Sequence, residues 1–593
     1  MVKALLSSWS CEPRNEPSTI FLHLRTDGGF MPCASHLRFI SIAGDYGQAL
    51  LAPNLLPEIV PLLECPSCRV VGHDLLFDLG IIRNEIGRRL QLTNLWDTRL
   101  ASQLLDNGLC SKESSLQSIC RDLLGWHFGD SPEASGRASG KSSNPSAREM
   151  DYASRVCAVL ESIQAKQMSL IRMNRMEDIA RIEFQALPAL VEIEYSGIGF
   201  DGERGRRLLE SLIDEKDRLE RELEQHAKGA KFRGFNPRNP VHVKRLLQSR
   251  GYGLKSTSAA DLERILSEHP KELFVKSILR YRELRQKIGF LKNWIDCARE
   301  NRIYPRLTQL GGRSGRITCS RPNIQQVPRD PLLKKLFVAS KGMVFVEADF
   351  SAIEMRIIAV LSGDKAMQRI FKNGLDPHRQ TAQVIFQKKK VSDEERQIAK
   401  TLNYGTIYGG GANMILSNLP SLSEEQAREF LHRFYDAYPD LQRWQRMVTD
   451  GAREVEVDGQ AYKISRSALG RIRHVDPRHR NAMINTPVQA TGADLQKIAL
   501  GRLYEKIASP QYSDFRLINA VHDSILLEVP DKRKKEASRL LSSVMEEAGN
   551  EILKVIPCLT DVKVGKDWSF DKDGGMLSGL VSMIRHFFKI ACE

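Results

Sequence analysis

The sequence predicts a multi-domain protein of mixed α/β and α+β class. Its 593 residues exceed what one hydrophobic core can organise, which favours about two to four domains. From Thr19 to about Ile163, short β-type runs alternate with helical stretches, a pattern typical of an α/β domain. Helical patterns then dominate, and strands return among helices from Asn301 onward. We therefore expect an α/β front domain that is joined by helices to a larger mixed region.

The composition argues against a membrane protein and favours a polyanionic partner. Apolar residues make up 42% of the chain, and no apolar run approaches the roughly 18 residues that a membrane span needs. Polar and charged residues interrupt the start of the chain before a signal-peptide core can form, so we expect a cytoplasmic protein. The eleven cysteines lack zinc-site spacing and are expected to be reduced. A formal net charge of +14 favours binding to phosphates through the release of counterions.

Three segments are predicted from composition and periodicity without any chemical role. Residues 129–146 are rich in Ser, Gly and Pro and predict a flexible insertion in the front domain. The charged segment Glu203–Lys228 carries leucines near helical spacing and predicts a helix that packs on another helix. Met576–Ile590 is apolar with interspersed basic residues and predicts an amphipathic helix, which packs on the body or docks a partner.

Two predicted β elements carry aspartates. Met343–Asp349 reads as a buried strand that ends in a carboxylate, although a lone aspartate there more often caps a helix. Leu517–Val529 consists of two apolar runs around His522-Asp523-Ser524, which predicts a β-hairpin with a polar tip. Polar tips are common without function. If the two elements meet in one sheet, however, their carboxylates can hold two Mg²⁺ ions, an arrangement used in phosphoryl transfer.

A basic and aromatic helix is predicted between these two elements. Residues Glu395–Gly409 place four side chains at four-residue intervals, so that they follow one slowly winding helix face: Arg396, Lys400, Tyr404 and Tyr408. Two cations and two rings suit a nucleoside triphosphate, with the cations on phosphate oxygens and a ring on the base. A solvated basic face with packed aromatic residues is the alternative.

Together these segments resemble the three polymerase motifs of family A DNA polymerases, the DNA polymerase I family. Motif A resembles Asp349–Arg356, motif B resembles Arg396–Gly409, and motif C resembles Val521-His522-Asp523. Further family-like segments follow the same order along the chain: Ser314-Gly315-Arg316, Pro322-Asn323-Ile324-Gln325, Asp376-Pro377-His378-Arg379, Asn485-Thr486-Pro487-Val488-Gln489 and Gly565-Lys566-Asp567-Trp568. The resemblance implies a right-hand fold of palm, fingers and thumb over roughly residues 180 to 570.

By this resemblance, the site residues have specific expected roles. Asp349 and Asp523 hold two Mg²⁺ ions, for which Mn²⁺ can substitute, with help from the backbone carbonyl of Phe350. Lys400 also serves as a proton donor to pyrophosphate. The deoxynucleoside triphosphate is bound by Arg396, Lys400, Tyr404, His378 and Glu354, where Glu354 excludes a 2′-hydroxyl. Primer and template are contacted by Arg316, Asn323, Gln325, Tyr408, Asn485, Gln489 and His522.

Two positions depart from the common family pattern, and a third resembles one of the family's variants. Ser524 stands where motif C commonly has Glu, and Ala352 stands where motif A commonly has Gln. Both primary metal ligands remain, so activity is expected to survive with altered rate, metal preference or template tolerance. Tyr404, where some members carry Phe, implies sensitivity to dideoxynucleotides.

The front domain resembles the 3′-5′ exonuclease domain of the same family, an RNase H-like α/β fold. The resemblance rests on Gly72–Asp78, on Trp96–Ala101 and on Tyr152-Ala153. At the expected carboxylate positions the chain has His23, Arg25, Asp78 and Val156, so only one acid remains. Because two dications need several carboxylates, we expect a domain that does not proofread and serves as a scaffold or DNA clamp.

The resemblance implies the following domain boundaries. We expect a tail (1–18), an exonuclease-like domain (19–165), connecting helices and thumb (166–300), palm and fingers (301–575, with fingers at about 365–450) and an extra C-terminal helix (576–593). The expected function is DNA synthesis on primer-template DNA from deoxynucleoside triphosphates, by a monomer. Two alternatives stay open: copying of an RNA template, and a catalytically inactive protein that grips primer-template.

Overall fold

The computed structural model describes residues 18–27, 35–45, 47–109, 113–129, 146–229, 232, 234–419 and 422–570. The expected insertion apart from its two end residues, the expected tail apart from its last residue, and the expected C-terminal helix lie outside these residues. In the described part of the chain, no helix is both long and apolar enough to cross a membrane.

The front unit is an α/β domain, as the alternating pattern predicts. Its five-stranded sheet has the order β3-β2-β1-β4-β5, with β1 antiparallel to β2 and parallel to β4. Both faces of β1 carry buried residues; α6 packs on β1 and β2, and α2 packs on the neighbouring strand β4. The elements are β1 (Ser18–Thr26), β2 (Leu37–Gly44), β3 (Gly47–Leu51), α2 (Leu56–Leu63), β4 (Cys68–Gly72), α3 (Leu75–Ile86), β5 (Leu95–Asp97), α4 (Thr98–Leu105), α5 (Leu116–Ile119) and α6 (Ala147–Met173).

A second unit consists of four helices with a core of their own. The predicted charged helix forms as α8 and packs along α11, so the expectation of helix-on-helix packing is confirmed. Leu223 of α8 is fully buried there with Phe274 and Tyr281 of α11. The four helices are α8 (Gly202–Gly229), α9 (Pro240–Ser249), α10 (Ala259–Glu268) and α11 (Leu273–Cys297).

A four-stranded antiparallel sheet of order β14-β15-β10-β16 lies at the centre of the molecule. The predicted strand and the predicted hairpin are both confirmed, as β10 and as β14 with β15. Helix α21 packs on this sheet, and α20 packs against α21. The elements are β10 (Met343–Phe350), α20 (Arg480–Ile507), β14 (Arg516–Val521), β15 (Ser524–Pro530), α21 (Lys534–Leu553) and β16 (Thr560–Gly565).

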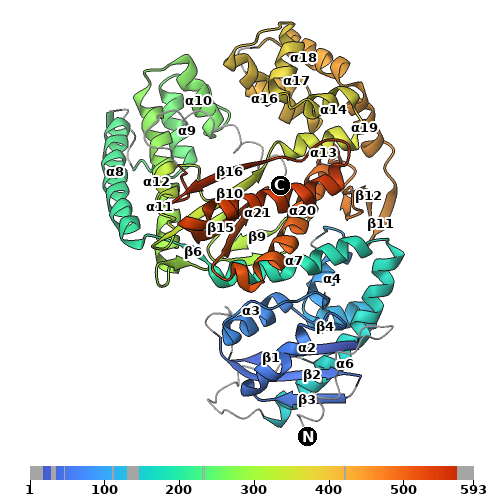
Figure 1. The fold of residues 1–593 in the computed structure, drawn as a ribbon. Helices are drawn as coiled ribbons and strands as arrows, with labels where there is room; N and C mark the ends of the chain where they lie inside the picture. The colour runs from blue at the N-terminus through green and yellow to red at the C-terminus, as the bar shows by residue number, and fades with distance from the viewer. Residues whose placement is uncertain are drawn as a thin grey trace.

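A second helical group follows β10. Figure 1 shows this group and the four-helix unit on opposite sides of the central sheet, with the front unit below. Its helices are α13 (Ile353–Leu361), α14 (Lys365–Lys372), α15 (Pro377–Phe386), α16 (Asp393–Ile407), α17 (Ala412–Asn418), α18 (Glu424–Ala437) and α19 (Pro439–Thr449). The smaller elements are β6 (Ile198–Gly199), β7 (Arg302–Ile303), β8 (Arg306–Thr308), β9 (Thr318–Ser320), α12 (Pro331–Lys334), β11 (Glu454–Val457), β12 (Gln460–Arg466) and β13 (Ile472–Val475).

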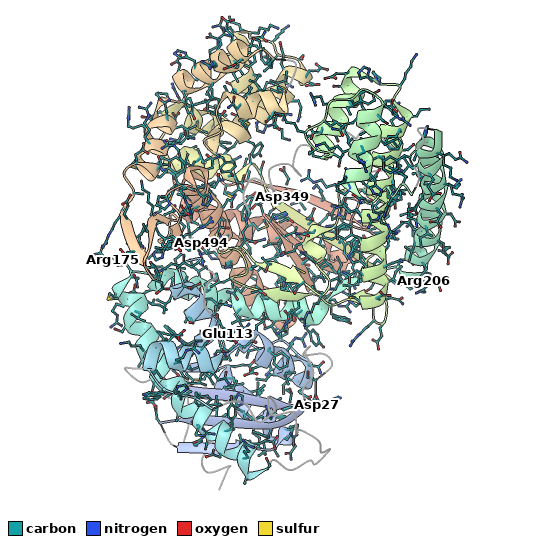
Figure 2. The ribbon with its side chains drawn as sticks, turned by 180° about the vertical axis from the view of Figure 1, so that it is seen from behind. Asp27, Glu113, Arg175, Arg206, Asp349 and Asp494 are labelled. Carbon is teal, nitrogen blue, oxygen red and sulfur yellow. The ribbon has the colours of Figure 1, made fainter. Side chains whose placement is uncertain are left out.

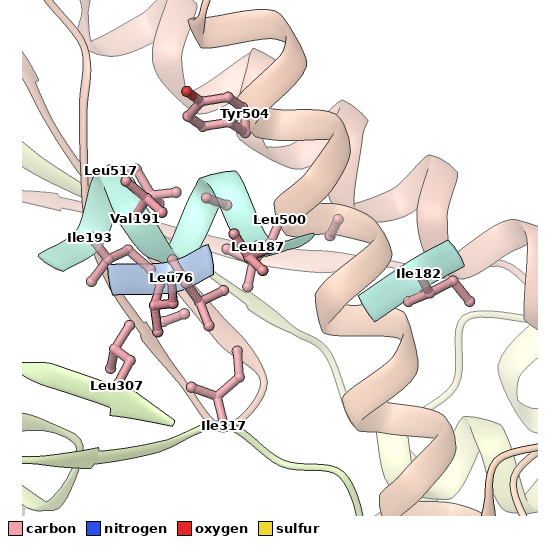
Figure 3. Packing of buried hydrophobic residues seen from close by; sticks show 14 of the residues in the cluster. Leu76, Ile182, Leu187, Val191, Ile193, Leu307, Ile317, Leu500, Tyr504 and Leu517 are labelled. Carbon is pink, nitrogen blue, oxygen red and sulfur yellow. The ribbon is translucent and has the colours of Figure 1, made fainter. Parts of the chain in front are cut away.

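Helix α7 (Glu177–Ser196) joins the front unit to the central sheet. It packs against α3 of the front unit and against α20 and β14 beside the sheet. In Figure 3, Leu76 of α3 lies beside Val191 and Ile193 of α7, and Leu500 of α20 lies beside Leu187. These residues belong to one buried cluster that continues from the front sheet into the central sheet. The front unit therefore shares its apolar core with the region that carries the aspartates.

Candidate active site

Two aspartates lie at the same end of the central sheet. Asp349 is the second-last residue of β10 and stands directly opposite Ser524, the first residue of β15. Asp523 belongs to the two-residue turn before β15, and its carbonyl accepts a hydrogen bond of 3.1 Å from the amide of Phe350. Figure 2 shows Asp349 in the central sheet, at the level between the two helical groups. The sheet thus brings the two predicted metal ligands together.

The backbone beside each aspartate adopts the left-handed conformation. Ala352, which precedes α13, has φ of 49°, and His522 in the hairpin turn has φ of 54°. Such residues cost about 1–3 kcal/mol and persist where the surroundings hold them. Arg356 holds the first turn: its Nε donates to the Ser351 carbonyl at 2.8 Å, and its Nη1 donates to the Pro557 carbonyl at 2.6 Å. Arg356 belongs to the sequence motif, but only the fold shows that its side chain holds this turn.

The predicted basic and aromatic helix forms as α16. It starts with a capping box, in which Ser392 and Glu395 bond each other's backbone amides. Three of the four predicted side chains lie on it: Arg396, Lys400 and Tyr404. Tyr408 is the residue just after the last helical turn, so the predicted single face ends one residue earlier than the spacing suggests.

Asp376 holds Arg396 against the start of α15. The Arg396 Nε donates to Asp376 Oδ2 at 2.7 Å, while the other carboxylate oxygen accepts from the amides of His378 and Arg379. Burial raises the pKa of Asp376, but the Arg379 amide and the Arg396 guanidinium outweigh burial and hold the pKa below its usual range. Asp376 lies in the family-like segment Asp376-Pro377-His378-Arg379, but the resemblance predicts no role for Asp376 itself.

His378 is buried and uncharged at neutral pH. The Thr381 hydroxyl donates to Asn403 Oδ1 at 3.0 Å, which leaves the Asn403 amide nitrogen to donate to His378 Nδ1 at 3.0 Å. The His378 proton therefore resides on Nε2. Burial lowers the pKa of His378 to about 4, aided by nearby Lys400 and Arg396 and opposed by Asp376. His378 can thus offer a phosphate a hydrogen bond but no positive charge.

Arg316, Glu354 and Tyr408 form a half-buried group near Asp523. Arg316 Nη2 lies 3.2 Å from Glu354 Oε1. Burial lowers the pKa of Arg316, but Glu354 and then Asp523 outweigh it, so the pKa is raised. Burial and the adjacent Glu354 carboxylate raise the pKa of Tyr408 well above its usual value. Arg316 and Tyr408, the residue that follows α16, are therefore close enough to Asp523 for their charges to interact.

The other predicted primer and template residues lie in the turn after β9 and on α20. Gln325 Nε2 donates to the Ala520 carbonyl of β14 at 2.9 Å, and Asn323 Oδ1 accepts from the Gln325 amide at 3.0 Å. Asn485 is buried and Gln489 is half-buried, both on α20. Gln325 is thus bonded to the strand that leads to Asp523, and Asn485 and Gln489 lie on the helix that packs against α21.

The first strand of the front unit carries His23 and Arg25, at positions where the resemblance predicts acids. His23 has a pKa lowered to about 4 by burial and by Arg25, and its Nε2 has no hydrogen-bond partner among the described residues. Arg25 Nε lies 3.8 Å from Glu149 Oε1 of α6. Val156 is 1% exposed within α6. These three positions offer no carboxylate to a cation.

Two aspartates of the front unit, Asp78 and Asp97, bond to backbone amides. Asp78 is buried, and burial together with Asp74 and Asp97 raises its pKa well above the usual value, although the Leu24 amide opposes this shift. Asp97 caps helix α4, and it accepts from the amides of Leu75 at 2.6 Å, Arg99 at 2.8 Å and Leu100 at 3.0 Å. Among the described residues, no three His, Cys, Asp or Glu side chains form a group that could hold a metal ion.

A central sheet with paired aspartates, flanked by two helical groups, defines the class of right-hand nucleotide polymerases. The chain belongs to DNA polymerase family A, whose family model matches residues 206–570. A model described as 3′-5′ exonuclease matches residues 42–166. The expected fold class, an exonuclease domain followed by a family A polymerase fold, is confirmed.

Several known proteins are similar to this chain. DNA polymerase I of Aquifex aeolicus is 28% identical over 584 residues, which cover 93% of this chain and 96% of the relative. Thermostable DNA polymerase I of Thermus aquaticus is 30% identical over 406 residues, which cover 65% of this chain and 47% of the relative. The chain thus matches about half the length of the Thermus relative. The POL domain of Pol1 from M. smegmatis, solved with DNA primer-template and dNTP, has a TM-score of 0.79 at 21% identity, covering 96% of this chain and 98% of that one.

Proposed function

We propose that the chain is a template-directed DNA polymerase that adds deoxynucleotides to a primer 3′-hydroxyl with the aid of two divalent cations. The observation that carries this proposal is the pairing of Asp349 and Asp523, linked through the 3.1 Å hydrogen bond from the Phe350 amide to the Asp523 carbonyl. Polymerisation mainly requires a positioned hydroxyl and neutralised phosphate charge, so no protein nucleophile is needed.

The donor set of this site fits Mg²⁺. Two carboxylates and one backbone carbonyl supply oxygen ligands only, and Mg²⁺ is commonly held by one or two carboxylates together with waters and substrate phosphates. We propose Asp349, Asp523 and the Phe350 carbonyl as these ligands, with Mn²⁺ as a substitute. Once bound, two such cations supply activation of the attacking oxygen and stabilisation of the leaving one.

The side chains of α15 and α16 are proposed to bind the triphosphate. Arg396 and Lys400 neutralise phosphate oxygens, His378 donates a hydrogen bond from Nε2, and Lys400 protonates the leaving pyrophosphate. Asp376 supports this role, because it holds the Arg396 side chain at 2.7 Å and keeps it oriented before the nucleotide binds. Glu354, held by Arg316 at 3.2 Å, is proposed to close the space that a 2′-hydroxyl would occupy.

Tyr404 is expected to make the enzyme sensitive to dideoxynucleotides. Its hydroxyl offers a hydrogen-bond donor near the sugar, which compensates for a missing 3′-hydroxyl. A hydrogen bond to a charged group contributes about 1.5–3 kcal/mol, so Tyr404→Phe is expected to raise the dideoxy- to deoxynucleotide ratio needed for termination about 10- to 100-fold. Termination ladders over a range of ratios measure this effect, and equal ladders for both proteins would refute the assignment.

We further propose that the front domain does not proofread. Asp78 and Asp97 bond backbone amides, and His23, Arg25 and Val156 stand where acids would hold cations. We expect a primer with a mismatched 3′ end to show no shortening above background, both with the wild-type protein and with Asp78→Asn. A proofreading polymerase run in parallel controls the substrate. Shortening that Asp78→Asn abolishes would show that the domain is an active exonuclease.

Each domain of the chain is proposed to have its own role. Residues 19–165 act as a scaffold or DNA clamp, 166–300 supply connecting helices and thumb, and 301–575 supply palm and fingers, with the fingers at about 365–450. The shared buried cluster that joins the front unit to the central sheet supports the scaffold role. The protein is proposed to act as a monomer on primer-template DNA.

A further inference from the structure

Four charged side chains are buried together beneath the candidate active site. Glu183 of α7, Asp494 and Lys497 of α20 are each 0% exposed, and Arg471 before β13 is 3% exposed. Lys497 Nζ lies 2.6 Å from Glu183 Oε1, and Arg471 Nε donates to Asp494 Oδ1 at 2.6 Å. Arg471 also contacts Glu183 directly. We call these four residues the buried charge cluster.

Stability alone does not explain the cluster. Charges taken out of water lose hydration, and a packed apolar set of similar volume is often as stable or more stable. The cluster does, however, keep two positive and two negative groups in one fixed arrangement. Gln309 further fixes the Glu183 carboxylate, because its Nε2 donates to Glu183 Oε2 at 2.6 Å. Such an arrangement is suited to positioning a neighbouring segment.

The segment in contact with the cluster is the turn that carries Arg316. Lys497 Nζ donates to the Gly315 carbonyl at 2.7 Å. The Arg471 side chain packs against Gly315 so closely that a Cβ there would lie 2.7 Å from Arg471 Nε. Gly315 also has φ of 82°, a conformation that favours glycine. Two members of the cluster thus hold the backbone of the residue that precedes Arg316.

Arg316 connects this turn to the reacting centre. Its guanidinium lies 3.2 Å from Glu354 and is close enough to Asp523 for their charges to interact. Helix α20, which supplies Lys497 and Asp494, also carries Asn485 and Gln489. In Figure 2, Asp494 lies below Asp349, on the side of the front unit.

We propose that the buried charge cluster is a positioning device for Arg316. Lys497 and Arg471 fix Gly315, and this holds the Arg316 guanidinium on Glu354 beside Asp523 when a primer end arrives. The inference rests on the proposed polymerase function. Within that function, it makes Lys497 and Glu183 positioning residues, which act on the reaction through Arg316 and touch neither substrate nor metal.

A double-mutant cycle tests this proposal. We expect Lys497→Met to lower kcat/KM for correct dNTP addition about 10- to 100-fold in the wild-type background, but less than about threefold in an Arg316→Ala background. The melting temperature should fall by the same amount in both backgrounds. An equal loss of kcat/KM in both backgrounds would show that the cluster supports folding only. Absence of extension by the wild-type protein would instead refute the polymerase proposal itself.

Helix α7 offers a matched pair of variants in case Lys497→Met does not fold. Glu183→Gln keeps one side-chain oxygen that can accept from Gln309 or Lys497 but removes the charge. Glu192→Gln, on the same helix, removes a carboxylate that is 2% exposed and pairs with Arg83 and Arg89 at the front unit. Glu183→Gln should lower kcat/KM about 5- to 20-fold, an effect that Arg316→Ala removes. Glu192→Gln should lower only the melting temperature, and an equal effect of both variants on kcat/KM would overturn the proposal.

Discussion

Replacing Asp349 or Asp523 by asparagine is expected to lower kcat for nucleotide addition at least about a thousandfold, or about 4 kcal/mol of transition-state stabilisation. Each carboxylate is proposed to supply a negative charge and an oxygen ligand at one end of the sheet. Asparagine keeps the size and one oxygen of the side chain but loses the charge that draws a hard dication. Single-turnover extension of a labelled primer with Mg²⁺ measures the loss.

Two controls separate catalysis from binding and folding. Primer-template affinity, measured by fluorescence anisotropy without nucleotide, should change less than about threefold in either variant, because most of that affinity comes from phosphate contacts. Asp531→Asn removes an acid that follows β15 at the opposite end of the sheet, and it should leave kcat unchanged. Near-normal kcat in Asp349→Asn or Asp523→Asn would contradict the proposed metal site.

Removing the positive charge of the Lys400 side chain is expected to have the second largest effect on nucleotide addition. Lys400→Met should lower kcat/KM for dNTP about 100- to 1,000-fold, since loss of one preorganised donor to a developing anion costs about 2.7–4 kcal/mol. Its proposed role as proton donor to pyrophosphate places much of this loss in kcat. Pre-steady-state incorporation over a range of dNTP concentrations separates kcat from nucleotide affinity.

The chain offers a matched control for Lys400. Lys388 lies just before α16 on the same helical group, and its Nζ is bound to Glu395 at 2.6 Å on the surface. Lys388→Met should change kcat/KM less than about twofold, because an exposed pair contributes little. If Lys388→Met and Lys400→Met reduce kcat/KM equally, a general loss of positive charge explains the result and the assigned role of Lys400 is wrong.

Local patterns predict the elements that carry the site. The strand over Met343–Asp349 and the hairpin around Asp523 follow from apolar runs and polar turn residues that are neighbours in the sequence. The helix with Arg396, Lys400 and Tyr404 follows from four-residue spacing, yet the helix ends before Tyr408. Helix ends depend on caps and on packing, which periodicity alone does not determine.

The contacts that organise the site are not predictable from local patterns. Glu183 and Lys497 are 314 residues apart, and Glu183 and Arg471 are 288 apart, so neither pair leaves a signal in spacing. A Glu in a predicted helix is expected on the surface, and only the fold shows that Glu183 is buried with its partners. The same holds for Asp376 with Arg396 and for Arg356, whose bonds depend on turns formed by distant residues.

In the front unit, too, side-chain contacts are not predictable from local sequence patterns. The sequence resemblance predicts that His23, Arg25 and Val156 stand where acids are expected. The sequence does not reveal that Asp97 bonds three backbone amides, or that burial and neighbouring acids raise the pKa of Asp78. Both observations follow from the close approach of β1, α3 and β5, which only the fold provides.

Extension of a labelled primer by the wild-type protein, with Mg²⁺ and all four deoxynucleotides, tests the central claim most directly. On a DNA template we predict full extension whose sequence follows the template. A matched RNA template in parallel tests whether reverse transcription belongs to the function. No extension on either template, with primer-template binding intact, would contradict the polymerase proposal and favour a protein that only grips primer-template.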